Sequence, residues 1–392
     1  MNFKLFPFLF ILAFFANGCI TDFNANLPLN EEQILIVDGE ITENSEVVFY
    51  LTKSFSLESI DMPQESIIRN AKLTIIGSNG YESPPAINMG NHAYRIFVGE
   101  LNDNVEYGIR IELNGDVYQS KLSKPLYTPE IDSVTWNQPE AWGPVYFYVS
   151  THDDSKDVKF FSWDFVEDWE YTANLYTPVF MDPFDSSFYS IEPAPYYHCW
   201  SKGKSNSIAI GSTESLKENR IIDKQFYKCD YLGNRFSELY CITVYQKVIS
   251  KEAYDYYQNK LKINTEMGGL FTPQPFELSG NISCITNPSK KVMGYIEISK
   301  NKTQKRIFIY YHEVKSDRNY RVCDELTADS VKIFLRENRL TYLDFYKMGF
   351  RPTGALDSRT DLPSHWAYFI CTDCTQNGGT KNKPDFWPNT HQ

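Results

Sequence analysis

Between residues 33 and 128, short stretches of alternating hydrophobic and polar residues recur, separated by turn residues. This alternation has the two-residue period of a half-buried β-strand, so each stretch predicts one strand. The strongest turn signal is Asn114-Gly115, which joins residues 107–113 to 117–121, because both residues tolerate the positive φ of a tight hairpin. Several short strands at this spacing predict an Ig-like or transthyretin-like β-sandwich over residues 33–128.

Strand patterns continue over residues 131–392, after a linker marked by Pro125 and Pro129. Two segments have the period of a helix instead: residues 251–262, which Ser250 can cap, and residues 328–338. The predicted fold is therefore all-β, an N-terminal sandwich followed by a larger β-rich domain over residues 131–392 with one or two short helices.

The start of the chain has the pattern of a secretory signal. Lys4 precedes an apolar run from Leu5 to Ala16, and Gly18 stands directly before Cys19. The run is shorter than the roughly 20 apolar residues that a membrane-spanning helix needs. A cysteine after a small residue resembles a bacterial lipobox, although Ala16 replaces the usual leucine. We expect a lipoprotein signal peptide over residues 1–18, acylation of Cys19 and a lipidated tether over residues 19–32; ordinary signal cleavage is the alternative.

Composition narrows the range of functions. The chain has 392 residues and a formal net charge of −12, which argues against a nucleic-acid partner. If Cys19 carries lipid, seven of the eight cysteines remain, and all of them follow residue 198. Disulfides are plausible in an oxidising envelope, but an odd number leaves at least one thiol unpaired, and the pairing cannot be read from the sequence.

Residues 160–200 combine aromatic and acidic side chains and contain no lysine or arginine. Carboxylates beside aromatic rings suit a cationic or hydroxylated ligand. Four prolines between residues 178 and 195 indicate a long irregular insertion. The simpler interpretation is an ordered loop whose aromatic rings pack on the second domain. The residues expected to contact a ligand or partner are Trp163, Trp169, Tyr171, Tyr196, Tyr197, Asp164 and Asp168.

Cys371 and Cys374 form a CxxC pair, which has three interpretations: a structural closure, half of a zinc site, or a redox pair. A redox pair needs its first cysteine at a helix N-terminus, but a strand-like segment precedes Cys371. Zinc needs two more ligands, and the sequence contains no second CxxC. We therefore favour structural cysteines and expect no metal and no cofactor.

Signals of common enzyme classes are absent from the sequence. It contains no Gly-x-Ser-x-Gly nucleophile elbow and no glycine-rich nucleotide loop. Asp153-Asp154 and the acidic residues of the aromatic segment could supply paired carboxylates for hydrolysis. We accordingly expect no catalytic residue, and an envelope hydrolase that uses carboxylates remains the alternative.

Short motifs are spread over the chain, at residues 35–42 (LIVDGEIT), 70–75 (NAKLTI), 118–120 (YQS), 274–276 (QPF), 280–284 (GNISC), 294–295 (GY), 371–374 (CTDC) and 378–387 (GGTKNKPDFW). Together they resemble the lipoproteins of domain of unknown function 4249, common in Bacteroidota. The resemblance implies an outer-membrane lipoprotein, often encoded beside a TonB-dependent transporter, and implies no catalytic mechanism. Cys229 and Cys241 are less typical of the family, so the expected structural cysteines are Cys199, Cys284, Cys323, Cys371 and Cys374.

These observations lead to one hypothesis and two alternatives. We expect a non-enzymatic lipoprotein, anchored in the outer membrane through Cys19 and facing the cell exterior, that captures a small-molecule or peptide nutrient or covers the mouth of a TonB-dependent transporter. The alternatives are an envelope hydrolase and a purely structural envelope protein.

Overall fold

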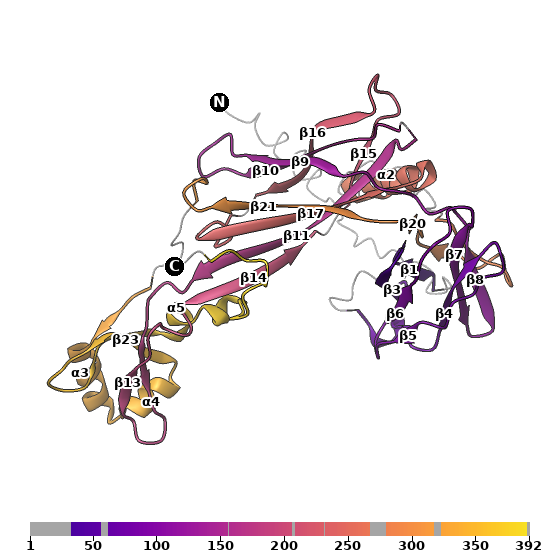
Figure 1. The fold of residues 1–392 in the computed structure, drawn as a ribbon. Helices are drawn as coiled ribbons and strands as arrows, with labels where there is room; N and C mark the ends of the chain where they lie inside the picture. The colour runs from indigo at the N-terminus through magenta and orange to yellow at the C-terminus, as the bar shows by residue number, and fades with distance from the viewer. Residues whose placement is uncertain are drawn as a thin grey trace, which may run out of the picture.

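The computed structural model describes residues 33–389 except 56–61, 156, 206–207, 231, 267–279 and 317–322. The expected signal peptide, Cys19 and the tether lie outside the described residues. Within the described part of the chain, no helix is long and apolar enough to cross a membrane. The elements form two β-sandwiches and a smaller lobe of strands and short helices (Figure 1). The prediction of a β-rich chain with few short helices is confirmed.

The first sandwich packs two antiparallel-rich sheets around a core that includes Phe49, Ile109 and Tyr94. The hairpin at Asn114-Gly115 is confirmed, since Leu113 pairs with Asp116 across it and both turn residues have positive φ. One sheet has the order β19 (Val292–Met293), β1 (Leu35–Asp38), β3 (Ser45–Lys53), β6 (Ala93–Val98) and β5 (Ile87–Asn88); the other has the order β18 (Ile282–Cys284), β8 (Asp116–Ser120), β7 (Tyr107–Leu113) and β4 (Lys72–Gly77).

The chain returns to the first sandwich after it has built most of the second. Strand β18 extends one sheet, β19 pairs in parallel with β1, and β20 (Ile298–Ser299) pairs in parallel with β2 (Ile41–Thr42). Ile282, Ile296 and Ile298 are buried in the first core. The division expected between residues 33–128 and 131–392 therefore needs correction, because residues 282–299 supply strands and core side chains to the first sandwich.

The second sandwich packs a three-stranded sheet against a larger one around Phe147, Trp163 and Tyr240. The smaller sheet has the order β16 (Arg220–Cys229), β10 (Val145–His152) and β9 (Ile131–Asn137). The larger has the order β14 (His198–Lys204), β11 (Phe160–Thr172), β17 (Leu239–Val248) and β21 (Thr303–Tyr310), with β15 (Ala209–Ser212) also paired to β11.

Helix α2 (Lys251–Glu266) confirms the first predicted helix. The Ser250 hydroxyl accepts a hydrogen bond of 3.1 Å from the Ala253 amide, which caps the helix as expected. Ala253, Tyr257 and Leu261 share one face and pack with Phe160 of β11. The helix therefore lies against the second sandwich, on the side that faces the first.

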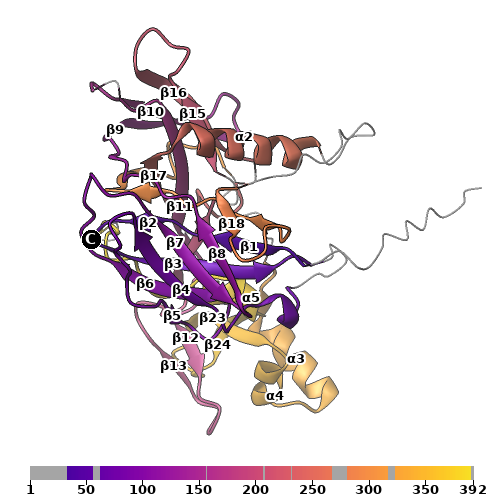
Figure 2. The ribbon, with the colours of Figure 1, turned by 90° about the vertical axis from the view of Figure 1, so that its right-hand side faces the viewer.

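A third unit, here called the α/β lobe, lies at the other end of the larger sheet from the first sandwich (Figure 1), and Figure 2 shows it opposite α2. Its core includes Trp366, Phe345 and Met181. Helix α3 spans the predicted residues, and Thr327 caps it. The lobe contains β12 (Val179–Met181), β13 (Phe188–Ser190), β22 (Leu326–Thr327), α3 (Ala328–Asn338), α4 (Tyr342–Lys347), β23 (Phe350–Leu356), β24 (Pro363–Tyr368) and α5 (Phe369–Thr372).

Candidate functional site

A cleft of about 800 Å³ separates the first sandwich from the second. One wall comes from β1, β2 and β3 of the first sandwich, and the other comes from β11, β14, β17 and α2 of the second. This volume lies in the range of roughly 300–1,000 Å³ that small-molecule sites occupy. Charged side chains of both signs line it, so the cleft suits a polar ligand better than an apolar one.

Ion pairs tie the two walls together at the base of the cleft. Glu40, which follows β1, accepts a bond of 2.6 Å from the Lys247 ammonium of β17 and also contacts Lys302, just before β21. Lys247 is only 9% exposed. Glu40 therefore connects the first sandwich to the second, and removing it would leave a buried ammonium uncompensated.

A second group of charged side chains lines the cleft without forming ion pairs between its two walls. Asp164 projects from β11, and burial raises the pKa of its carboxyl above the usual value, although Lys247 and Lys204 oppose the shift. Lys204 and Lys260 are exposed and make no ion pair within the described residues. These two ammonium groups can bind an anionic or hydroxylated ligand in the cleft.

The first 13 residues of the aromatic and acidic segment, Phe160–Thr172, form the central strand β11. Side chains of β11 alternate between the two faces of the larger sheet, so Trp163, Trp169 and Tyr171 enter the core of the second sandwich. They are 1%, 7% and 2% exposed. The expectation that these three contact a ligand is therefore corrected: the pattern came from a strand between two layers and not from an irregular binding loop.

The remaining predicted contact residues do not come together. Asp164 reaches the cleft, whereas Asp168 is 5% exposed on the outer face of β11, where burial raises the pKa of its carboxyl. Tyr196 is 39% exposed, and the centroid of its ring lies 4.6 Å from the Lys381 ammonium. Tyr197 packs against the ring of Tyr176. Both tyrosines precede β14, whose other end borders the cleft.

Strands β12 and β13, which precede those tyrosines in the chain, form a hairpin with exposed aromatic side chains. Phe184 at its turn is 98% exposed, and Tyr189 and Ile191 are 44% and 40% exposed. Carboxylates hold the turn in place, since Asp182 accepts from the Phe184 amide at 2.8 Å. Residues 160–200 do therefore carry an exposed aromatic surface, at the hairpin and not in β11.

The CxxC cysteines form disulfides with two other cysteines. Cys371 bonds to Cys323 and Cys374 bonds to Cys199, so the pair links the α/β lobe to the larger sheet and closes the lobe on itself. Of the five expected structural cysteines, Cys284 differs: it is a free thiol, 2% exposed in the core of the first sandwich.

Two further cysteines, Cys229 and Cys241, are also buried and belong to neither disulfide. Among the described residues, no group of three or more potential ligands could hold a metal ion.

Sequence reasoning missed the residues that form the cleft. Glu40 and Lys247 are 207 positions apart. Glu40 lies within the motif of residues 35–42, but nothing in that motif indicates an ion pair, and no motif surrounds Lys247. Their neighbours are ordinary strand residues, so no local signal identifies the pair. Only Asp164 had been singled out, and for its place in the aromatic segment.

Comparisons with known proteins give a family and a set of distant structures. The family model described as "Domain of unknown function (DUF4249)" matches residues 20–305. No curated protein matches this chain. A two-domain fibronectin type-III segment of chicken tenascin is 9% identical and covers 56% of this chain and 100% of its own, with a TM-score of 0.16. A chicken interferon gamma receptor alpha chain is 8% identical and covers 55% and 90%, with a TM-score of 0.14. A Salmonella alpha-2-macroglobulin is 7% identical and covers 56% and 14%, with a TM-score of 0.18.

Proposed function

This chain belongs to the DUF4249 family, and we propose that it is a non-enzymatic outer-membrane lipoprotein that captures a polar ligand for a TonB-dependent transporter. The observation that carries the proposal is the cleft between the two sandwiches. It has the volume of a ligand site, and its walls come from two sandwiches that the Glu40 ion pairs connect. Lys204 and Lys260 supply donors for an anionic or hydroxylated ligand.

The location rests on the leader sequence. The basic and apolar start, the small residue and Cys19 together support acylation. Two or more acyl chains anchor a protein stably at a membrane surface. The tether then presents the first sandwich near the bilayer, with the second sandwich and the α/β lobe beyond it along the chain.

The transporter contact belongs to the exposed hairpin. Phe184, Tyr189 and Ile191 form an aromatic and aliphatic surface on the α/β lobe, and Asp182 and Asp185 flank it. Aromatic residues are enriched where one protein meets another. A partner surface with basic residues around an apolar pocket complements this hairpin.

The test purifies the tagged protein from its native outer membrane in mild detergent and identifies both proteins and small molecules by mass spectrometry. A stoichiometric TonB-dependent transporter and a bound small molecule are the expected results. Lys204→Gln with Lys260→Gln removes the small molecule and keeps the transporter, whereas Phe184→Ser does the reverse. Lys217→Gln and Leu216→Ser, exposed on a loop of the second sandwich, are the matched controls. Recovery of the protein alone, without ligand, overturns the proposal.

One observation favours the alternative of an envelope hydrolase. Burial raises the pKa of the Asp164 carboxyl, and this carboxyl lines the same cleft as Glu43 and Glu46, as a pair of acids in different environments would. Hydrolysis predicts that Asp164→Asn abolishes turnover of the recovered ligand, while capture predicts an unchanged ligand after long incubation with the native protein. A purely structural role predicts neither a ligand nor a transporter.

A further inference from the structure

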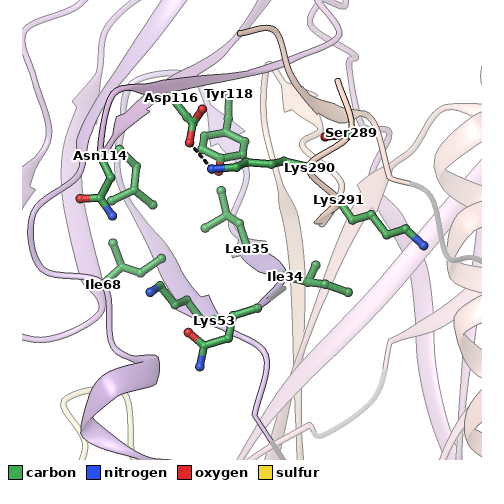
Figure 3. A pocket seen from close by; sticks show the side chains of 12 residues that line it. Ile34, Leu35, Lys53, Ile68, Asn114, Asp116, Tyr118, Ser289, Lys290 and Lys291 are labelled. Carbon is green, nitrogen blue, oxygen red and sulfur yellow. Dashed lines mark hydrogen bonds and ion pairs between the residues drawn. The ribbon is translucent and has the colours of Figure 1, made fainter. Parts of the chain in front are cut away.

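A second cavity, of about 500 Å³, opens at the end of the first sandwich where the described chain begins. It lies between the two sheets, bounded by the start of β1, the end of β3, the β7–β8 hairpin and the loop before β19 (Figure 3). None of its lining residues lines the cleft between the sandwiches. It is therefore a separate site, and what it binds is independent of the function proposed above.

The floor of this cavity is apolar. Leu35, Ile68, Leu113 and Tyr118 line it and are 4%, 3%, 7% and 6% exposed, so the cavity reaches the edge of the first core. Burying an apolar group there removes it from water at roughly 25 cal/mol per Å². A purely ionic ligand would leave this floor unused.

The rim of the cavity is cationic in a chain whose formal net charge is −12. The Lys290 ammonium bonds to Asp116 at 2.6 Å, and this bond lowers the pKa of the Asp116 carboxyl, so the only acidic residue of the lining is already neutralised. Lys53 is half-buried and makes no ion pair within the described ranges. The side-chain oxygen of Asn114 accepts a bond from Asn70, which directs the Asn114 amide donors elsewhere.

We infer that this cavity binds an amphiphilic anion, a molecule with one phosphate or carboxylate head on an aliphatic body. The head binds Lys53 and the Asn114 amide at the rim, and the body covers Leu35, Ile68 and Leu113 on the floor. Lys290 stays paired with Asp116, and the two charges cancel, so the free positive charge facing the head comes from Lys53. Lys291 also lines the rim, but Figure 3 shows its side chain extending away from the others.

The position of the cavity suits a ligand found at a membrane. Gln33, the first described residue, lines the cavity, and 14 residues (19–32) separate it from the end of the leader. A fully extended chain of that length reaches roughly 50 Å, at 3.3–3.6 Å per residue. If Cys19 is acylated, the cavity therefore opens within that distance of the bilayer, where amphiphilic anions are concentrated.

Calorimetry with the mature chain from Cys19 onward, produced without acylation, tests the inference with three probes: octyl phosphate below its micellar concentration, inorganic phosphate, and octyl glucoside. We expect one octyl phosphate per chain and at least tenfold weaker binding of the other two, because each lacks either the body or the charge. Lys53→Gln should weaken octyl phosphate binding about tenfold, the usual scale for one charge-assisted bond. Lys291→Gln, the matched control, should not change it.

Flotation with vesicles that contain phosphatidic acid then separates two sources of the ligand. Flotation that Lys53→Gln reduces and Lys291→Gln does not identifies a bilayer lipid, whereas octyl phosphate binding without flotation identifies a soluble amphiphile. Equal affinity for inorganic phosphate and octyl phosphate overturns the inference, because it reveals a simple anion site. Equal losses in the two lysine variants, or no binding of octyl phosphate, overturn it as well.

Discussion

The Oε1 atom of Glu297 accepts a hydrogen bond of 2.9 Å from the hydroxyl of Ser250. Glu297 directly precedes β20 of the first sandwich, and Ser250 caps α2 on the second. One serine therefore serves both a helix terminus and a carboxyl group from the neighbouring body. Because Glu297 is only 4% exposed, desolvation raises the pKa of its carboxyl to about 7.

The raised pKa of Glu297 predicts that stability falls as the pH rises toward neutrality. Between the ordinary pKa of 4.5 and the folded value of about 7, the folded chain keeps the Glu297 proton while the unfolded chain has lost it. At roughly 1.4 kcal/mol per pKa unit, the free energy of unfolding should decrease by about 3 kcal/mol across this window. Glu297→Gln removes that titration and should flatten the pH profile relative to the native chain, as measured by urea unfolding.

Glu218→Gln provides the control for this pH profile. Glu218 is exposed on a loop of the second sandwich, so its replacement should leave the slope of stability against pH unchanged. A Glu297→Gln profile that runs parallel to that of the native chain would show that the buried carboxyl is already ionised near pH 5.

The Glu40–Lys247 pair predicts a large cost when one partner is removed. Glu40→Ala leaves the Lys247 ammonium, which is 9% exposed, without its bond of 2.6 Å. Breaking a buried pair costs about 3–5 kcal/mol, and adding Lys247→Met should restore part of this loss. Chemical denaturation measures both effects.

Lys72 and Glu112 offer a comparison at a similar distance, 2.8 Å, but with side chains that are 47% and 46% exposed. Glu112→Ala should cost less than about 1 kcal/mol. Similar losses of stability for Glu40→Ala and Glu112→Ala would contradict the idea that burial makes the Glu40–Lys247 pair the stronger of the two.

Local patterns predicted the local structure well, because their causes lie within a few residues. Asn114-Gly115 identifies a hairpin through its backbone preferences, and Ser250 identifies a helix start through its hydroxyl. The aromatic and acidic pattern of residues 160–172 has an equally local cause, the alternation of a strand between two layers. The prolines that suggested a binding loop all follow β11, within the β12–β13 hairpin or beside it, and none interrupts the strand.

The cleft depends on contacts that no local pattern contains. Lys247 meets Glu40 only because β17 and β1 belong to two packed bodies. Parallel pairing of β1 with β19 also joins segments more than 250 residues apart, and it returns the chain to the first sandwich. Such pairings are selected by the packing of the whole chain, so one sequence alone could not indicate them.

Trp163 should behave as a core residue and not as a ligand contact. It is 1% exposed, and its indole nitrogen donates to Gln246 at 2.7 Å. Trp163→Ala removes a large buried side chain and leaves a polar partner unsatisfied, which should cost about 3–5 kcal/mol. Tyr196→Ala, at a position that is 39% exposed, should cost about 1 kcal/mol or less. Melting curves of the two variants provide the measurement, and a stable Trp163→Ala protein would contradict the described core.

The cysteine pairing predicts a definite thiol count. The chain after Cys19 contains seven cysteines, of which four form the disulfides Cys199–Cys374 and Cys323–Cys371. Denatured but unreduced protein should therefore expose three reactive thiols, those of Cys229, Cys241 and Cys284. Folded protein should react slowly, because all three thiols are buried.

Replacing Cys199 and Cys374 together by serine should lower stability by about 2–5 kcal/mol, because their bond closes a sequence separation of 175 residues. Cys284→Ala, which removes a buried thiol outside any disulfide, is the comparison. A denatured, unreduced chain with one reactive thiol would indicate a third disulfide and contradict this pairing.

The C-terminal segment is expected to act as a structural clasp. The indole nitrogen of Trp387 donates to Oε2 of Glu170 at 3.0 Å, and the ring packs with Leu239 and Cys241 on the outer face of the larger sheet. Glu170 is fully buried, so Trp387→Ala deprives a buried carboxylate of a donor and uncovers apolar surface. We expect a loss of about 3–5 kcal/mol.

Trp387→Phe helps to separate the packing of this clasp from its hydrogen bond, since it keeps a smaller aromatic ring and removes the donor. If the hydrogen bond to Glu170 contributes, Trp387→Phe should be more stable than Trp387→Ala but less stable than the native chain. Adding Glu170→Gln to both variants should change the difference in stability between them. The hydrogen-exchange rates of the β11 and β17 amides should increase from the native chain to Trp387→Phe and again to Trp387→Ala, because the C-terminal segment covers both strands. Unchanged exchange in Trp387→Ala would mean that the tail rests on the sheet without stabilising it.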